Sequence, residues 1–191
     1  MSAGWIVLVV LGLVVLFFIF TYNRLVALRQ AYKNAFADID VQLKQRQDLV
    51  PNLVETVKGY ASHEAGVFEK VTEARAAAQR AGSMADRGRA EGALTAAIGQ
   101  VLAVAENYPQ LKASDNFRQL QSELDDLENK IAAARRFLNN AVAEFNTQIE
   151  QFPALLVARP LGFSHAEMFA LDAADKAAAS TPPKVSFGGQ S

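Results

Sequence analysis

The fold is decided by residues 117–145, "FRQLQSELDDLENKIAAARRFLNNAVAEF". Apolar side chains recur in this stretch at alternating spacings of three and four residues, and beyond it only Gln148 interrupts the pattern. This 3.5-residue repeat is the period at which α-helices wrap around one another with left-handed packing. We therefore expect one long helix that begins after Ser114, its N-cap, and ends at Pro153. The apolar stripe comprises Phe117, Leu120, Leu124, Leu127, Ile131, Ala134, Leu138, Ala141, Phe145 and Phe152.

Three upstream segments also show helical apolar spacing. The first covers residues 23–46. The second is expected to begin at Asp48 as N-cap, which puts Pro51 in the first turn, where its missing N–H loses no intrahelical partner. It ends near Gly82, in the glycine-containing stretch "AGSMADRGRAEGA", and the third helix covers residues 90–107. The alternative is a single helix that continues, kinked, through Pro51.

Four helical segments joined by short connections predict an all-α protein with an up-down-up-down four-helix bundle. After the bundle, "SHAE" at residues 164–167 has capping-box spacing and predicts a short helix over residues 166–179. The Pro-, Gly- and Ser-rich end, residues 180–191, predicts a flexible tail. The expected domains are an anchor at residues 1–22, the bundle at residues 23–153 and a C-terminal extension at residues 154–191.

The N-terminal segment, residues 3–20, reads "AGWIVLVVLGLVVLFFIF" and carries no charged or strongly polar side chain. As a helix it would span about 27 Å, close to the ~30 Å hydrocarbon core of a bilayer. Trp5 and Tyr22 stand at its two ends, where aromatic rings anchor a helix at the membrane interface. The alternative is a cleaved signal peptide, but no basic region precedes the apolar run and "FTYNRL" offers no small-x-small cleavage site. We therefore expect a single transmembrane anchor that continues directly into the next helix.

Basic residues follow this segment and none precedes it. The positive-inside rule therefore predicts a bacterial membrane protein with its N-terminus outside and its bundle in the cytoplasm. The juxtamembrane helix carries a net charge of +3, which could lie against anionic lipid. The charged residues are Arg24, Arg29, Lys33, Lys44 and Arg46, with Asp38 and Asp40 as the acids.

The composition excludes several functional classes. The chain has 19 basic and 20 acidic residues, so no nucleic-acid partner is expected. It has no cysteine, which excludes disulfides, thiolate catalysis and thiolate metal sites. His63–Glu64 resembles the start of an H-E-x-x-H zinc motif, but position 67 is Val. Asp38 and Asp40 are two residues apart on a helix and do not share a face.

We therefore predict no catalytic, cofactor-binding or metal site and no enzymatic activity. The acids and histidine that an enzyme could have used are Asp40, Glu55, His63 and Glu64. Glu64 falls on the apolar stripe of its helix, where it would either reach water or pair with Arg135 or Arg136.

Two long stretches resemble the LemA family of bacterial membrane proteins. They are "YNRLVALRQAYKNAFADIDVQLKQRQDLVPNLVETVKGYASHE", residues 22–64, and "NYPQLKASDNFRQLQSELDDLENKIAAARRFLNNAVAEFNTQIEQFP", residues 107–153. The similarity continues into Gly162–Phe163, and no matching pattern follows. Where family members often have Trp then Ser, this chain has Phe36 and Ala37. The resemblance implies one N-terminal anchor, a four-helix bundle, no catalytic activity and an undefined biochemical role. A related branch is associated with magnetosome membranes.

The function expected from this reading is a membrane-anchored helical scaffold that self-associates and organises membrane or partner proteins. The alternative is a signalling or protease-accessory protein that presents its bundle to another membrane protein. The expected partners are the lipid bilayer, further copies of the chain and another membrane protein. The segment "KVSF", residues 184–187, could pair with a copy of itself if it is not simply a disordered tail.

Overall fold

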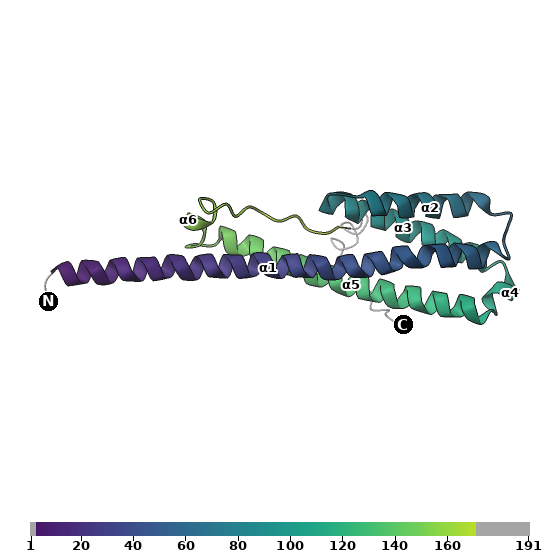
Figure 1. The fold of residues 1–191 in the computed structure, drawn as a ribbon, viewed down its shortest axis with the longest axis horizontal. Helices are drawn as coiled ribbons and strands as arrows, with labels where there is room; N and C mark the ends of the chain where they lie inside the picture. The colour runs from purple at the N-terminus through teal and green to yellow at the C-terminus, as the bar shows by residue number, and fades with distance from the viewer. Residues whose placement is uncertain (1–2, 171–191) are drawn as a thin grey trace, which may run out of the picture. The chain divides into compact units, whose positions relative to one another are not determined.

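The computed structural model describes residues 3–170, and over that range it is helical without strands. The all-α prediction is confirmed. Four long helices follow one another, with a short helix on each side of the last (Figure 1). Their bounds are α1 Ala3–Lys58, α2 Ala65–Arg80, α3 Met84–Ala105, α4 Pro109–Lys112, α5 Asp115–Glu150 and α6 Leu155–Ala158. The described residues form two compact units, one of residues 3–49 and 119–168 and the other of residues 50–118 and 169–170.

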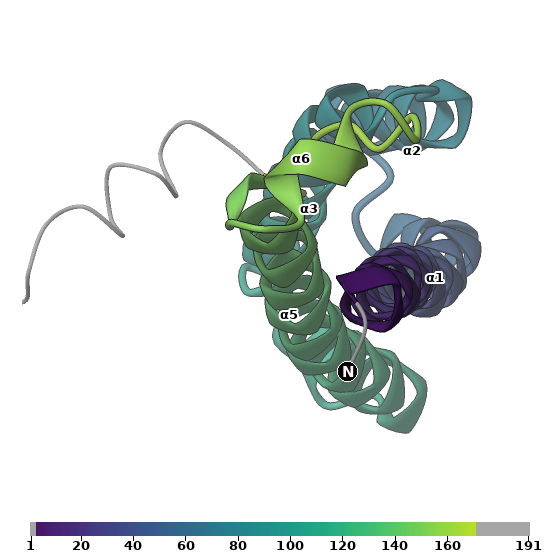
Figure 2. The ribbon, with the colours of Figure 1, turned by 90° about the vertical axis from the view of Figure 1, so that its left-hand side faces the viewer.

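In the first unit, α1 and α5 lie side by side and antiparallel (Figure 1, and end-on in Figure 2). Near the start of the pair, Arg24 Nε donates a 3.0 Å hydrogen bond to Gln148 Oε1. Farther along, the rings of Tyr32 and Phe145 lie 5.1 Å apart. Residue numbers thus rise along α1 as they fall along α5. The buried face of α1 in this unit includes Leu25, Ala35, Ile39 and Leu43.

The predicted apolar stripe of α5 is buried along most of its length. Phe117, Leu124, Ile131 and Phe145 are all nearly inaccessible to solvent. Toward the end of the helix the buried set moves to Val142 and Ile149, which are not members of the 3.5-residue stripe. An α-helix has 3.6 residues per turn, so a strict 3.5-residue repeat drifts around its surface. Phe152, the last member of the stripe, lies beyond the helix end and is 79% exposed.

The N-terminal part of α1 has the properties expected of a membrane anchor. Every large apolar side chain from Trp5 to Phe20 is exposed. This helix is long and apolar enough to cross a membrane, with a mean hydropathy of 2.8 in its most apolar window and none of that window buried. A core helix of similar composition would bury these side chains. The structure is therefore consistent with membrane anchoring.

The prediction that a second helix begins at Asp48, after a turn at residues 46–51, is wrong, and the alternative of a single helix that continues through Pro51 is confirmed. The helix α1 runs through Pro51 and ends at Lys58, and the chain turns instead over residues 59–64. Asp48 does not cap a new helix; its carboxylate lies 4.0 Å from the Lys44 ammonium within α1. Pro51 lacks the N–H that would bond to the carbonyl four residues earlier. The helix nevertheless continues, because the side chains on both sides of Pro51 are buried.

The third helix also begins earlier than predicted, at Met84 and not at residue 90. The Ser83 hydroxyl accepts a 3.0 Å hydrogen bond from the Asp86 N–H and donates a 2.6 Å bond to the Asp86 carboxylate. The hydrogen bonds that the Ser83 hydroxyl and the Arg89 guanidinium donate to the Asp86 carboxylate lower the pKa of that carboxyl. The ionised carboxylate therefore favours the folded state at neutral pH, and this contribution is lost as the pH falls through its lowered pKa.

Gly88 lies inside α3, at a point where another part of the chain approaches the helix closely. A Cβ at this position would lie 2.0 Å from the carbonyl oxygen of Ala170, because the chain crosses α3 there. Only glycine allows this close approach without a shift of the backbone. The glycines that suggested a loop thus include one that serves packing inside a helix.

A C-terminal helix was predicted over residues 166–179, but residues 166–170, where it would begin, are not helical. The rest of that prediction, the flexible tail and the "KVSF" segment lie outside the described residues. A short helix that was not predicted, α6, follows Pro153 instead. The chain after α6 is held against α5 by Asn146, whose side chain makes two 2.9 Å hydrogen bonds with the backbone of Ala166.

We predict that Ile131→Ala lowers the free energy of unfolding by about 2–5 kcal/mol, since the side chain is fully buried in α5. The matched control is Asn140→Ala on the same helix, where the side chain is exposed and the expected change is within about 0.5 kcal/mol. Urea titrations of the full chain in mild detergent, followed by circular dichroism, give both values. A loss below ~1 kcal/mol for Ile131→Ala would show that the stripe does not form the core.

Candidate functional site

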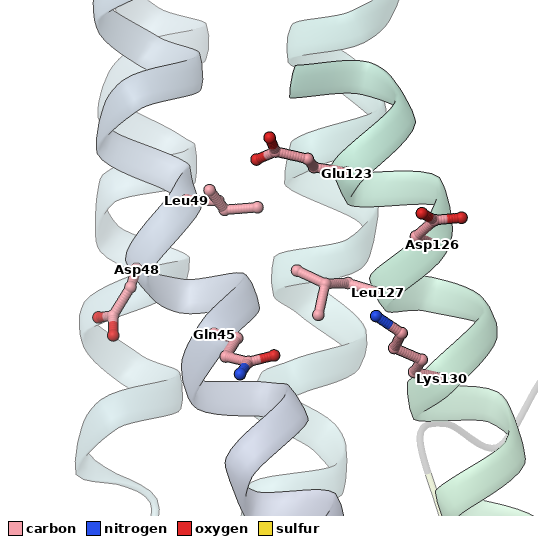
Figure 3. Close-up of a pocket in the computed structure, with 7 residues that line it drawn as sticks. All are labelled: Gln45, Asp48, Leu49, Glu123, Asp126, Leu127 and Lys130. Carbon is pink, nitrogen blue, oxygen red and sulfur yellow. The ribbon is translucent and has the colours of Figure 1, made fainter. Parts of the chain in front are cut away.

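A groove of about 360 Å³ lies between α1 and α5 in the first unit. Leu49 and Gln45 reach into it from α1, and Leu127 and Glu123 reach into it from α5 (Figure 3). The two leucines give the groove an apolar floor. The remaining lining residues are Asp48, Asp126 and Lys130, so the groove has an acidic margin with one basic side chain.

The apolar surface beside the groove continues toward the anchor. Val41 is 53% exposed and precedes Gln45 by four residues, so both lie on one side of α1. Phe137 is 60% exposed and follows Lys130 by seven residues, so both lie on one side of α5. We call the groove together with these two residues the groove face. Large exposed apolar residues beside a groove are typical of protein-binding surfaces.

An ion pair between one buried and one partly buried side chain joins the two helices at the level of the groove. The Arg46 side chain is fully buried, and its Nη1 donates a 2.5 Å hydrogen bond to Glu128 Oε1. Glu128 is only partly buried, so the pair lies at the edge of the core. A buried guanidinium is costly to desolvate and needs charged or polar partners. The Arg46–Glu128 pair therefore fixes the register between α1 and α5 where they form the groove.

The juxtamembrane charges are less available to lipid than the sequence suggested. Arg46 is buried with Glu128, and Lys44 lies beside Asp48. Arg24 is exposed but lies 3.8 Å from Glu144. Arg46 is therefore not available for the predicted contact of the +3 surface with anionic lipid.

The acids and histidine considered for catalysis are distributed over both units. Asp40 is half-buried on α1, whereas Glu55 is exposed near the end of the same helix. His63 is exposed in the turn, and Glu64 is the half-buried N-cap residue of α2. Among residues 3–170, no group of three or more His, Cys, Asp or Glu side chains is placed to hold a metal ion. The pairing of Glu64 with Arg135 or Arg136 stays a prediction.

Sequence reasoning missed the groove face. Phe137 lies next to Leu138 of the buried stripe, and Val41 lies two residues from both Ile39 and Leu43, so neither belongs to the core pattern. A large apolar residue outside an otherwise regular stripe was the available signal. The groove itself depends on the register of two helices whose facing residues are far apart in the sequence, 82 positions for Arg46 and Glu128, and periodicity alone does not give that register.

Comparison with known proteins gives a family match over most of the chain. Residues 35–187 match the sequence profile of the LemA family. The match extends well past Phe163. The interpretation that no family pattern follows this residue is therefore wrong.

Three similar curated proteins are magnetosome proteins by name. Magnetosome protein MamQ of Magnetospirillum gryphiswaldense is 24% identical over 174 residues, which cover 78% of this chain and 64% of the relative. Magnetosome proteins MamQ 1 and MamQ 2 of Paramagnetospirillum magneticum are each 25% identical over 187 residues, which cover 84% of this chain and 67% of the relative. The chain thus spans about two thirds of the length of these curated relatives.

We predict that Glu128→Ala lowers the free energy of unfolding by about 1–3 kcal/mol, because the buried Arg46 loses a charged hydrogen-bond acceptor. The control is Lys44→Ala, which removes an exposed ion pair with Asp48 and should change stability by less than about 0.5 kcal/mol. Urea unfolding of the full chain measures both. Equal effects of the two substitutions would mean that the buried pair does not stabilise the contact between α1 and α5.

Proposed function

The chain belongs to the LemA family, and we propose that it is a membrane-anchored helical scaffold that self-associates and organises membrane or partner proteins. The observation that carries this proposal is the continuity of α1. The 56-residue helix contains both the exposed apolar segment and the buried face of the first unit. At about 1.5 Å per residue, it is about 84 Å long.

A shared helix transmits the orientation of the anchor directly to the folded unit. A flexible linker would let a domain tumble above the membrane, whereas a continuous helix fixes its height and limits its tilt. Every copy of the chain in one bilayer then presents the same residues at the same height. Confinement to the membrane plane also raises the effective concentration of the copies. Both features favour self-association.

The groove face is the surface through which we propose that copies associate. It combines an apolar floor, two exposed large apolar residues and a charged margin, the composition of a protein interface with an apolar centre and a polar rim. Copies anchored in one membrane can meet by a two-fold axis along the membrane normal, which brings the same face of each copy together.

The proposed role is organisational and not enzymatic. The family match and the three relatives with magnetosome names support a membrane-associated helical protein, and the organising role is our proposal.

We propose that the protein crosses the bacterial cell membrane once, with its folded part in the cytoplasm. Arg24, Arg29 and Lys33 follow the apolar segment closely, as the positive-inside rule requires for this orientation. We expect a membrane-impermeant maleimide to leave a Phe137→Cys variant unlabelled in intact bacterial cells. Labelling of that cysteine would show that the folded part lies outside the cytoplasm.

Cysteine crosslinking tests self-association, and the cysteine-free chain makes it direct. We expect Val41→Cys and Phe137→Cys, each in the full chain in membranes, to form dimers with a short bifunctional maleimide, since both positions lie on the groove face. The control is Glu69→Cys, an exposed position on α2 outside that face. It should stay monomeric. Equal dimer yields at all three positions would indicate crowding. Monomers at both groove positions would favour the alternative, an accessory protein that presents its bundle to a different membrane protein.

A further inference from the structure

A second apolar surface lies at the opposite end of the paired part of α1 and α5 from the groove. It consists of four exposed side chains on the segment that follows α5: Phe152, Leu155, Leu156 and Leu161. We call it the α6 patch. Phe152 is 79% exposed and Leu156 is 64% exposed, whereas Val157 and Ala158 of the same short helix are buried. The segment thus turns one apolar side toward its own unit and another outward.

The packing of this segment places it where α1 leaves its apolar run. The ring of Phe163 makes an edge-on contact with the ring of Tyr22, with centroids 6.0 Å apart. Tyr22 follows the last residue of the apolar run, Phe20, by only two positions. Leu25 is buried in one cluster with Ala158 and Phe163. The α6 patch is therefore at the level of the membrane–water boundary of the anchor helix.

The segment is also fixed in this position. The two hydrogen bonds between the Asn146 side chain and the Ala166 backbone tie the returning chain to α5. The Arg29 guanidinium lies 5.0 Å above the centre of the Phe163 ring, a cation–π contact. Because these contacts come from both α1 and α5, the patch cannot leave the boundary without disrupting the buried cluster.

From this placement we infer that the α6 patch inserts into the interfacial layer of the same bilayer that holds the anchor. The inference rests on the proposed membrane anchoring by α1. Apolar side chains at the headgroup–acyl boundary gain from burial, as they do in interfacial helices. The protein then contacts the membrane at two points, the spanning helix and a loop beside it, which restrains rotation of the unit about the anchor.

The charges near the patch indicate which lipid is needed. Arg24 lies 3.8 Å from Glu144, and the His165 Nε2 atom lies 3.0 Å from Glu150 Oε1, so acidic side chains stand among the basic ones and the surface there is not uniformly basic. Exposed Arg159 is the basic side chain of the patch segment and is long enough to reach a lipid phosphate from the interface. Insertion therefore depends on apolar contact and does not require anionic lipid.

The experiment uses single-cysteine variants of the full chain, labelled with an environment-sensitive fluorophore and reconstituted in phosphatidylcholine nanodiscs. The test positions are Leu156→Cys and Leu161→Cys, both in the patch. Phe137→Cys is the matched control, since its exposure of 60% is close to the 64% of Leu156 and it lies about 20 Å before the end of α5, at 1.5 Å per residue. Val10→Cys, in the apolar run, reports on the anchor. Lipids carrying a nitroxide near the headgroup or deep in the acyl chain serve as quenchers.

We expect the labels at Leu156→Cys and Leu161→Cys to lose most of their emission with the shallow quencher and less with the deep one. The Val10→Cys label should respond most to the deep quencher, and the Phe137→Cys label to neither. Unquenched patch labels with a quenched Val10 label would overturn the inference and leave the anchor intact. An unquenched Val10 label would overturn the anchor as well. Equal quenching at Phe137 and Leu156 would also overturn the inference, because it would show that the dye itself enters the lipid.

Discussion

The burial of apolar side chains on both sides of Pro51 determines the rest of this structure. A proline in a helix interior costs about 3 kcal/mol through the lost hydrogen bond and the steric clash of its ring. Val50, Leu53 and Val57 are all buried in the turns around it. Burial of each such side chain contributes about 1.5–3 kcal/mol, so the continued helix is favoured over a break. The apolar run and the folded part of the chain therefore share one helix.

The antiparallel pairing of α5 with this helix has two consequences at its two ends. Far from the anchor, it creates a groove, and the Arg46–Glu128 ion pair sets the register of the two helices there. Near the anchor, it returns the chain to Tyr22 and Leu25, where Phe163 completes the buried cluster. A surface proposed for association between copies and a surface proposed for lipid contact thus both follow from the same helix pair, at different heights above the membrane.

The sequence predicted the elements whose periodicity is long and regular. The anchor and α5 were predicted because eighteen apolar residues and a stripe of several heptads leave little ambiguity. The turn at Pro51 was predicted wrongly because the local rules for N-caps and for proline in a first turn ignore burial on both sides. The start of α3 was missed because Gly88 counted as a loop residue, although its role is to admit the Ala170 carbonyl. The groove face and the α6 patch require the register of α1 against α5, which is a tertiary property.

The central claim, that one unbroken helix joins the anchor to the folded part, can be tested by pulsed electron paramagnetic resonance. Spin labels at Lys33→Cys and Lys58→Cys occupy exposed positions on α1, 25 residues apart. A continuous helix predicts a separation of about 37 Å, at 1.5 Å per residue. A reversal of the chain between residues 46 and 51 would fold the two positions back toward each other and give a separation below about 20 Å, since packed helices lie about 8–10 Å apart. A dominant distance in that shorter range would contradict the account.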